Sequence, residues 1–369
     1  MQKIDKFELI AMMILFLIGT TPLYELGVGA KQDAWLVVIV AMLAGLLLLL
    51  VYLFIQKRNE DHNLFEILNQ HLGRFLGTIV TAAYIFYFSY EAMRNTREFG
   101  DIINISFLPK TPLSLLMLIM ILLSAYAISK GTEVFFRVVE FLLPFTILGY
   151  FLIIVMFIVS KNIHLERLQP VLEHGVMPVI REAIPKVISF PFGEVVVFLA
   201  FWKHLNNKKN LSKLSIYSYL FVGILLLLFN LLNLTILSPQ ILSITTLPML
   251  RSVRLIEIAD FLERLDPVII LLIYIGIFVK MTAFYLGAVI GLSYLVKMSH
   301  KKLTIVVGTF IYAISFASPN FIYHTWIGFT RNLMYDFPVF QIWIPLGLAA
   351  VVMIKMIFSK KGKQTNGSQ

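Results

Sequence analysis

The 369-residue chain is 59% hydrophobic, only 14% charged, and has a mean hydropathy of +0.85 and a formal net charge of +10. Soluble domains contain about 25% charged residues, so this composition excludes an ordinary soluble protein. The chain has no cysteine, which excludes disulfides and thiolate metal sites. Its basic residues are scattered singly between apolar runs, and we interpret them as membrane topology signals with no nucleic-acid partner.

Apolar runs of roughly 20 residues recur along the chain, and each could cross about 30 Å of hydrocarbon. They predict ten transmembrane helices at 8–30, 34–55, 75–99, 112–129, 138–159, 187–203, 213–237, 265–297, 303–318 and 337–358. These runs are too long and too uniformly apolar for barrel strands, so the predicted class is an all-α integral membrane protein. Residues 1–360 are expected to form a single transmembrane domain, followed by a polar tail at 361–369.

The connections predict a sidedness and two short amphipathic helices. Lys and Arg are more frequent on one side, which places both termini in the cytoplasm. Apolar residues at helical spacing predict interfacial helices at 62–77, with Phe75 on the apolar side, and at 247–266. For the second of these, a docking surface for another subunit is the alternative. Asp5 and Glu8 are not typical of a cleavable leader, so we expect the first span to remain as a transmembrane helix.

Two spans are interrupted at matching places. Gly19-Thr20-Thr21-Pro22 breaks the first span, and Pro191-Phe192-Gly193-Glu194 opens the sixth. Each is the first span of a five-helix half, with the halves at about 8–159 and 187–358. Matching breaks of this kind indicate an inverted-repeat transporter fold, with a binding site at the unwound backbone. The alternative is that each break is a simple kink.

The break in the first span carries a family resemblance. The chain reads IGTTPLYELGVGAKQDAW at 18–35, LPF at 143–145 and FPFGE at 190–194. These segments resemble motifs of the endospore germination permeases, the B subunits of GerA-type nutrient receptors in spore-forming bacteria. The sequence departs from that pattern at Glu25-Leu26, where many members carry Leu-Pro, because its proline comes earlier, at Pro22. The resemblance therefore does not define the shape of the unwound turn.

The resemblance implies a fold and a function. Such proteins are similar to amino acid–polyamine–organocation transporters, with a LeuT-like 5+5 inverted-repeat core and broken helices 1 and 6. It implies a multi-pass protein of the bacterial cell membrane, located in the spore inner membrane. It also implies binding of a small germinant, such as an amino acid, and signalling through A-type and lipoprotein C-type receptor subunits. No cofactor is implied.

In such a core the ligand lies between spans one and six, and spans three and eight form the walls. The candidate ligand-binding residues are Gly19, Thr20, Thr21, Tyr84, Tyr87, Phe88, Phe192, Gly193, Glu194, Thr282 and Phe284. The aromatic residues of span three share one helix face with Glu91. That face either packs against a neighbour or lines the pocket. Glu91 is a charge within the membrane that we expect to pair with Arg94 or Arg97, near the outer end of the span.

Lys280 is the most informative charge, because it lies near the middle of span eight. A lysine there costs roughly 2.5–3.5 kcal/mol to insert. Our hypothesis is that its ammonium fills the gap between spans one and eight that commonly holds sodium in this fold, capping carbonyls freed at Gly19. Glu194 is a second possible partner, and snorkelling to the interface is the alternative.

Three classes of function can be weighed against these residues. The first is a receptor subunit that binds and signals, and the second is a secondary transporter of amino acids, proton-coupled through Lys280 or Glu194. The third, a membrane enzyme, has little support, because no HExxH or GxxxxGK motif occurs. His164, His174 and His324 lack metal-ligand spacing, so we expect no metal site.

Overall fold

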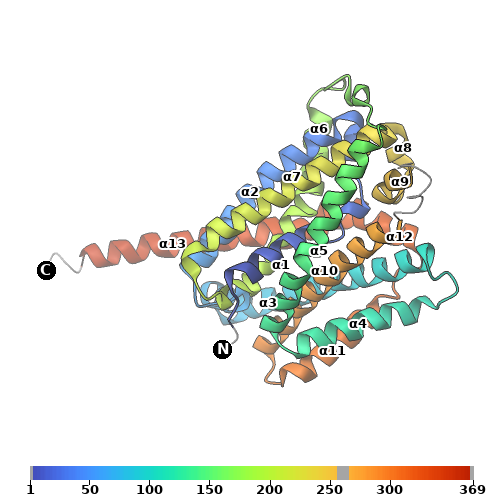
Figure 1. The fold of residues 1–369 in the computed structure, drawn as a ribbon. Coiled ribbons are helices and arrows are strands. Elements are labelled where there is room, and N and C mark those ends of the chain that lie inside the picture. Colours follow the sequence, from blue (N-terminus) through green and yellow to red (C-terminus); the bar gives the residue numbers. More distant parts are fainter. Residues whose placement is uncertain (1–2, 256–265, 366–369) are drawn as a thin grey trace.

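The computed structural model describes residues 3–255 and 266–365. Within these ranges the chain is a bundle of helices with no β-strand (Figure 1). The α-helices are α1 (Lys6–Ile18), α2 (Ala34–Arg58), α3 (Leu64–Ser106), α4 (Leu113–Ser129), α5 (Thr132–Val159), α6 (Met177–Glu182), α7 (Leu211–Leu237), α8 (Pro239–Ile244), α9 (Pro248–Arg254), α10 (Asp266–Leu295), α11 (His300–Ile314), α12 (Phe321–Ile327) and α13 (Ile344–Thr365).

Tighter and wider helical turns occur between these helices. The 3₁₀ segments are Thr21–Leu23, Val28–Asp33, Leu165–Leu168, Phe192–Ala200, Trp202–His204 and Lys208–Asn210. The π-helical segments are Ala183–Val187, Gly328–Asp336 and Val339–Trp343. Both predicted breaks coincide with a change of helix type. Such changes are common where a helix is interrupted for function.

Eight helical segments among the described residues are long and apolar enough to cross a membrane. They are Lys6–Leu23, Val28–Arg58, Leu64–Ser106, Thr132–Val159, Met177–Ala200, Lys208–Leu237, Pro267–Leu295 and Phe321–Phe358. The fourth and ninth predicted spans correspond to α4 and α11, which are shorter, at 17 and 15 residues. The count of ten crossings therefore stays a prediction.

The sixth and tenth spans begin earlier than the sequence predicts. The sixth starts at Met177, not 187, and the tenth at Phe321, not 337. Polar residues such as His324 and Asn332 lower the hydropathy of the tenth span, but they are buried against neighbouring helices and not exposed to lipid. At its other end, α13 continues to Thr365 and extends away from the bundle (Figure 1), so the predicted polar tail begins inside a helix.

The amphipathic segment at 62–77 is helical and forms the first part of α3. Asn63 caps it by accepting hydrogen bonds from the backbone N–H groups of Phe65 and Glu66. Gly73, at φ 79°, separates this part from the rest of α3. Phe75, predicted on the apolar side of this helix, lies two residues beyond Gly73 and is 82% exposed. The segment at 247–266 contains α9, and its residues 256–265 lie outside the described ranges.

α1 is the central helix of the bundle and packs against α5, α7 and α10 (Figure 1). Nearly every residue from Leu9 to Ile18 is buried. α10 approaches the end of α1 very closely, because a Cβ atom at Gly276 would collide with the carbonyl oxygen of Gly19. Small residues permit such close helix contacts in membranes. Spans one and eight therefore meet at the first break, as expected for the predicted core.

Candidate functional site

The first break requires glycine. α1 ends at Ile18, and Gly19 adopts φ 36° and ψ −120°, a conformation that side-chain-bearing residues avoid. A Cβ atom there would also lie 2.7 Å from Cδ of Lys280 and 2.6 Å from the carbonyl oxygen of Phe16. The next turn is stabilised by Thr21, whose hydroxyl donates to the carbonyl of Leu17 at 3.0 Å. The chain thus leaves the helix directly beside span eight.

Lys280 forms an ion pair with Glu194, which lies at the second break. Its Nζ lies 2.5 Å from Oε2 of Glu194, and the two side chains are 0% and 2% exposed. Nζ also donates to the Thr20 hydroxyl at 3.5 Å and lies 4.4 Å from the ring centroid of Phe190. Among the described residues, it forms no hydrogen bond to a carbonyl freed at Gly19, contrary to our hypothesis. The reason is that a carboxylate is the stronger partner for a buried ammonium.

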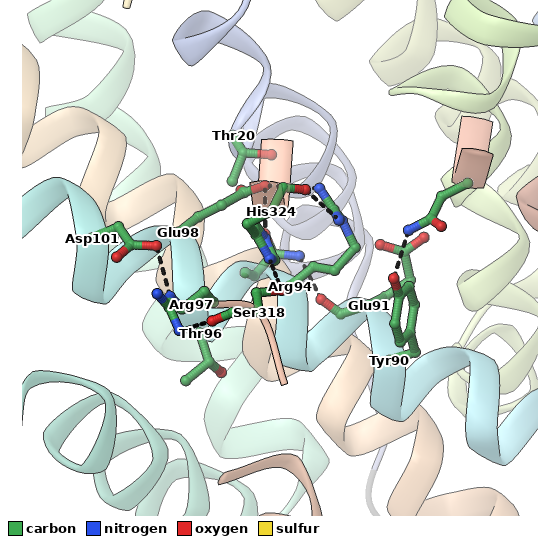
Figure 2. A network of polar contacts seen from close by, with 12 residues as sticks. Thr20, Tyr90, Glu91, Arg94, Thr96, Arg97, Glu98, Asp101, Ser318 and His324 are labelled. Atoms are coloured by element: carbon green, nitrogen blue, oxygen red, sulfur yellow. Dashed lines mark hydrogen bonds and ion pairs between the residues drawn. The ribbon is translucent and has the colours of Figure 1, made fainter. Parts of the chain in front are cut away.

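The outer half of α3 carries a network of buried charges (Figure 2). Nη2 of Arg94 lies 3.6 Å from Oε1 of Glu98, and Nε of Arg97 lies 2.7 Å from Oδ2 of Asp101. Each pair is one helical turn apart, so these acids occupy the arginines that we expected to pair with Glu91. That expectation was wrong. Oε1 of Glu91 is buried and has no hydrogen-bond partner among the described residues.

The same arginines connect α3 to span ten. Arg94 donates to the carbonyl of His324 at 3.1 Å, and Arg97 donates to the carbonyl of Ser318 at 2.7 Å. Figure 2 shows Arg97 between Asp101 and Ser318, and Arg94 beside Glu98 and His324. The Arg94 guanidinium also occupies the space beside Gly328, where a Cβ atom would collide with it. The charge network therefore positions the start of span ten against the outer half of α3.

A cavity of about 30 Å³ lies where the two breaks meet α3 and span ten. It is lined by Thr20, Tyr24, Glu91, Arg94, Asn95, Glu98, Phe190, Glu194, Gly328, Phe329, Leu333 and Phe337. This volume holds one or two water molecules. The cavity is therefore small, strongly polar on the α3 side and apolar on the span-ten side.

A larger cavity, which we call the outer vestibule, lies on the side predicted to face outward. It has a volume of about 480 Å³ and is lined by residues in 24–29, 182–190, 242–248 and 321–333. Tyr24, Phe190, Phe329 and Leu333 line both cavities. The ring centroid of Tyr24 is 6.0 Å from that of Phe190 and 5.1 Å from that of Phe329, and both pairs are edge to face. These three rings form an aromatic collar between the vestibule and the small cavity.

The structure brings some of the predicted site residues to the cavity. Thr20, Glu91 and Glu194 line it, and Gly19 and Lys280 lie directly behind. The other candidates do not line the small cavity. Those residues are Thr21, Tyr84, Tyr87, Phe88, Phe192, Gly193, Thr282 and Phe284.

The predicted aromatic face of α3 packs against span ten. The Tyr84 hydroxyl donates to the carbonyl of Phe340 at 2.6 Å, and the Tyr87 ring stacks on Phe340 with centroids 4.6 Å apart. Phe88 packs near Phe284. The packing interpretation of this face therefore holds for these rings, and only Glu91 reaches the cavity.

The remaining candidates also make structural contacts. Phe192 packs on the Tyr219 ring at 5.3 Å, and a Cβ atom at Gly193 would lie 2.5 Å from Oε1 of Gln341. The Thr282 hydroxyl donates to Ser124 at 2.8 Å. These residues hold the helices around the site in place.

Sequence reasoning missed several cavity residues, chiefly Tyr24, Asn95, Glu98 and the whole contribution of span ten. One signal was available, because 91–101 contains seven polar or charged residues in an otherwise apolar span. A stretch of that kind is expensive in a membrane and indicates a function. Phe329 and Leu333 gave no signal, because only the tertiary structure brings them to the breaks.

The Gln-Asp pair of the first-span motif has a structural role on the outer side. Gln32 donates to the carbonyl of Pro170 at 3.1 Å and to Glu173 at 3.0 Å. Asp33 accepts from the backbone N–H of Leu172 at 2.9 Å. The motif thus anchors the connection between spans five and six.

Comparison with known proteins identifies the family. A family model described as "Spore germination protein" matches residues 3–322. The chain belongs to this family. It is 30% identical over 364 residues to spore germination protein KB of Bacillus subtilis (strain 168), covering 98% of this chain and 97% of that protein. It is 25% identical over 320 residues to spore germination protein A2 of the same organism, covering 85% and 86%.

Solved structures show the fold of this family member. Mhp1, a nucleobase-cation-symport-1 family transporter in a closed conformation with bromovinylhydantoin bound, matches with a TM-score of 0.64 at 13% identity, covering 88% of this chain and 75% of that one. MhsT in complex with L-phenylalanine matches with a TM-score of 0.61 at 13% identity, covering 94% and 85%. The protein thus has the predicted LeuT-like fold with broken helices one and six. It is a multi-pass membrane protein of the spore germination family.

Proposed function

We propose that this protein is the membrane-embedded subunit of a nutrient germinant receptor in the spore inner membrane. It binds a small germinant, an amino acid or a similar nutrient, at the central cavity and triggers germination together with A-type and lipoprotein C-type subunits. The observation that carries the proposal is the charged cavity enclosed by both helix breaks. Membership of the spore germination family supports it.

The size of the cavity suggests how binding produces a signal. At about 30 Å³ it is too small for a whole amino acid. A germinant can enter only if the aromatic collar moves, and it therefore favours a second conformation in which spans one, six and ten are displaced. Partner subunits that contact those spans would then detect occupancy.

A cavity-filling substitution tests the position of the site. Leu333→Trp introduces a bulky indole at the boundary of the two cavities. Leu148→Trp makes the same change at an exposed position on α5 and is the matched control. In spores carrying this protein as their only receptor of its class, L333W should shift the germinant dose response to higher concentration, and L148W should not. Equal responses at equal protein levels would contradict the proposed site.

The second candidate function is a proton-coupled amino-acid transporter. The buried Lys280–Glu194 pair beside the breaks favours it, because such a pair can exchange a proton with the transport cycle. Uptake of labelled amino acids into proteoliposomes, with and without a proton gradient, separates the two functions. Germinant binding without uptake supports the receptor, and gradient-dependent uptake supports the transporter.

A further inference from the structure

We propose that Glu91 and Asn95 recognise a primary ammonium group of the germinant. The aromatic collar surrounds the path by which this group passes from the vestibule into the small cavity. The inference rests on the proposed function, because it assumes that the germinant reaches the central cavity. It adds the chemical class of the ligand and the residues that select it.

One cavity carboxylate has no close ion-pair partner of its own among the described residues. Among the described residues that line it, three are acidic, namely Glu91, Glu98 and Glu194. Arg94 faces Glu98 at 3.6 Å, and Lys280 faces Glu194 at 2.5 Å. Glu91 is 3% exposed and has no ion-pair partner in the described part of the chain. A buried carboxylate without a partner is costly, and a cation in the cavity would remove that cost.

Four buried polar atoms of cavity-lining residues have no hydrogen bond among the described residues, and two of them are acceptors on α3. The other two are the Tyr24 hydroxyl and Oε2 of Glu194, which is paired with Lys280. Oε1 of Glu91 and Oδ1 of Asn95 are buried without a hydrogen bond among the described residues. These residues are one helical turn apart on α3, and both line the cavity. The amide of Asn95 is oriented by its own hydrogen bond, because Nδ2 donates to the carbonyl of Glu91 at 2.8 Å. A ligand that satisfies both oxygens must therefore donate at least two hydrogen bonds from one compact group.

A primary ammonium fits this arrangement in charge, size and hydrogen bonding. It has three N–H donors, and its head is about as large as the water that the cavity could hold. A trimethylammonium group has no N–H donor and is too bulky for about 30 Å³. The rings of Tyr24, Phe190 and Phe329 stand at the boundary with the vestibule. Aromatic faces attract cations, so the collar favours passage of the same group. The rest of the ligand remains in the vestibule.

The probes are L-leucine, its N,N,N-trimethyl analogue and the 2-hydroxy acid that replaces its amino group with a hydroxyl. The other amino acids, simple primary amines, glucose and inosine complete the panel. Germination is recorded in spores with this protein as their only receptor of its class, and binding is measured on the full-length protein in nanodiscs. We expect responses only to primary amines. Response to the trimethyl or hydroxy analogue of an active amine, or to glucose or inosine alone, would overturn the inference.

Glu91→Gln keeps the shape and removes the charge. We expect it to weaken binding of the active amine about ten- to hundredfold, the effect of losing a hydrogen bond to a charged group. Its melting temperature without ligand should equal or exceed that of the wild type, because an uncompensated charge has been removed, and a purely structural Glu91 would give the opposite. Glu140→Gln, on α5, is the matched control. Unchanged amine affinity in E91Q would refute the role of Glu91.

The outcomes also separate this inference from the proposed function. A non-amine germinant whose response is lost in L333W leaves the proposed site intact and refutes the ammonium specificity. Absence of any germinant response or binding across the panel would refute both.

Discussion

The buried pair of Lys280 and Glu194 makes a strong prediction about stability. Replacing Lys280 with Met retains most of the apolar stem that packs at Gly19, and it leaves Glu194 buried without its cation. Removing one partner of a buried ion pair costs about 3–5 kcal/mol. Both side chains are almost completely buried, at 0% and 2% exposure, so solvent cannot reduce this cost. We therefore expect Lys280→Met to destabilise the protein by about that amount.

The double variant Lys280→Met/Glu194→Gln gives the decisive comparison. It removes both charges, so it should recover most of the stability that the single variant loses. The assay is denaturant unfolding of the purified proteins in the same detergent, completed as a double-mutant cycle with Glu194→Gln. A double variant as unstable as Lys280→Met alone would show that the two residues do not stabilise each other and would refute the ion pair.

Three further predictions follow from the same region. Because a protein ammonium lies beside the first break, germination should be unchanged when sodium is replaced by choline, and loss of the response would refute the idea that Lys280 replaces sodium. Gly19→Ala should lower the protein level in the membrane and not only shift the dose response, because its φ of 36° and its contact with Lys280 leave no room for a methyl group. Arg97→Ala should increase amide hydrogen exchange at 315–320, because two backbone carbonyls there lose their donor, and unchanged exchange would contradict that anchoring role.

The elements that depend on local signals could be predicted from the sequence. Both breaks contain glycine and proline, and the structure interrupts the helices at those places. The proximity of spans one and eight also agrees with prediction, because the fold implied by the breaks brings them together. The contact of Lys280 with Glu194 was foreseen only as an alternative. Sequence alone does not show whether a carbonyl or a carboxylate lies nearer to the ammonium.

The ion-pair partners of the charged residues on α3 were harder to predict from the sequence. Glu91, Arg94, Glu98 and Asp101 offer more than one pairing at helical spacing, and the choice depends on what faces each side of the helix. Arg94 is directed to span ten by the carbonyl of His324 and by the space at Gly328. Span ten itself was placed too late in the chain, because its polar residues resemble a loop until their burial is known. Glu91 has no ion-pair partner among the described residues because of two long-range features, namely the orientation of Arg94 toward span ten and the position of span ten itself.

Span ten is the element best suited to respond to a ligand. It supplies Phe329 to the collar and Leu333 to the cavity boundary, so a germinant that opens the collar must displace it. Its π-helical segments receive hydrogen bonds from neighbouring spans, with Tyr52 donating to the carbonyl of Gln341 at 2.5 Å and Tyr84 to that of Phe340 at 2.6 Å. These bonds involve backbone carbonyls and single hydroxyl groups, which can exchange acceptors at little cost. Span six, in contrast, is held to span eight by the ion pair of Glu194 and Lys280. The conformational change that carries the signal should therefore be largest in span ten.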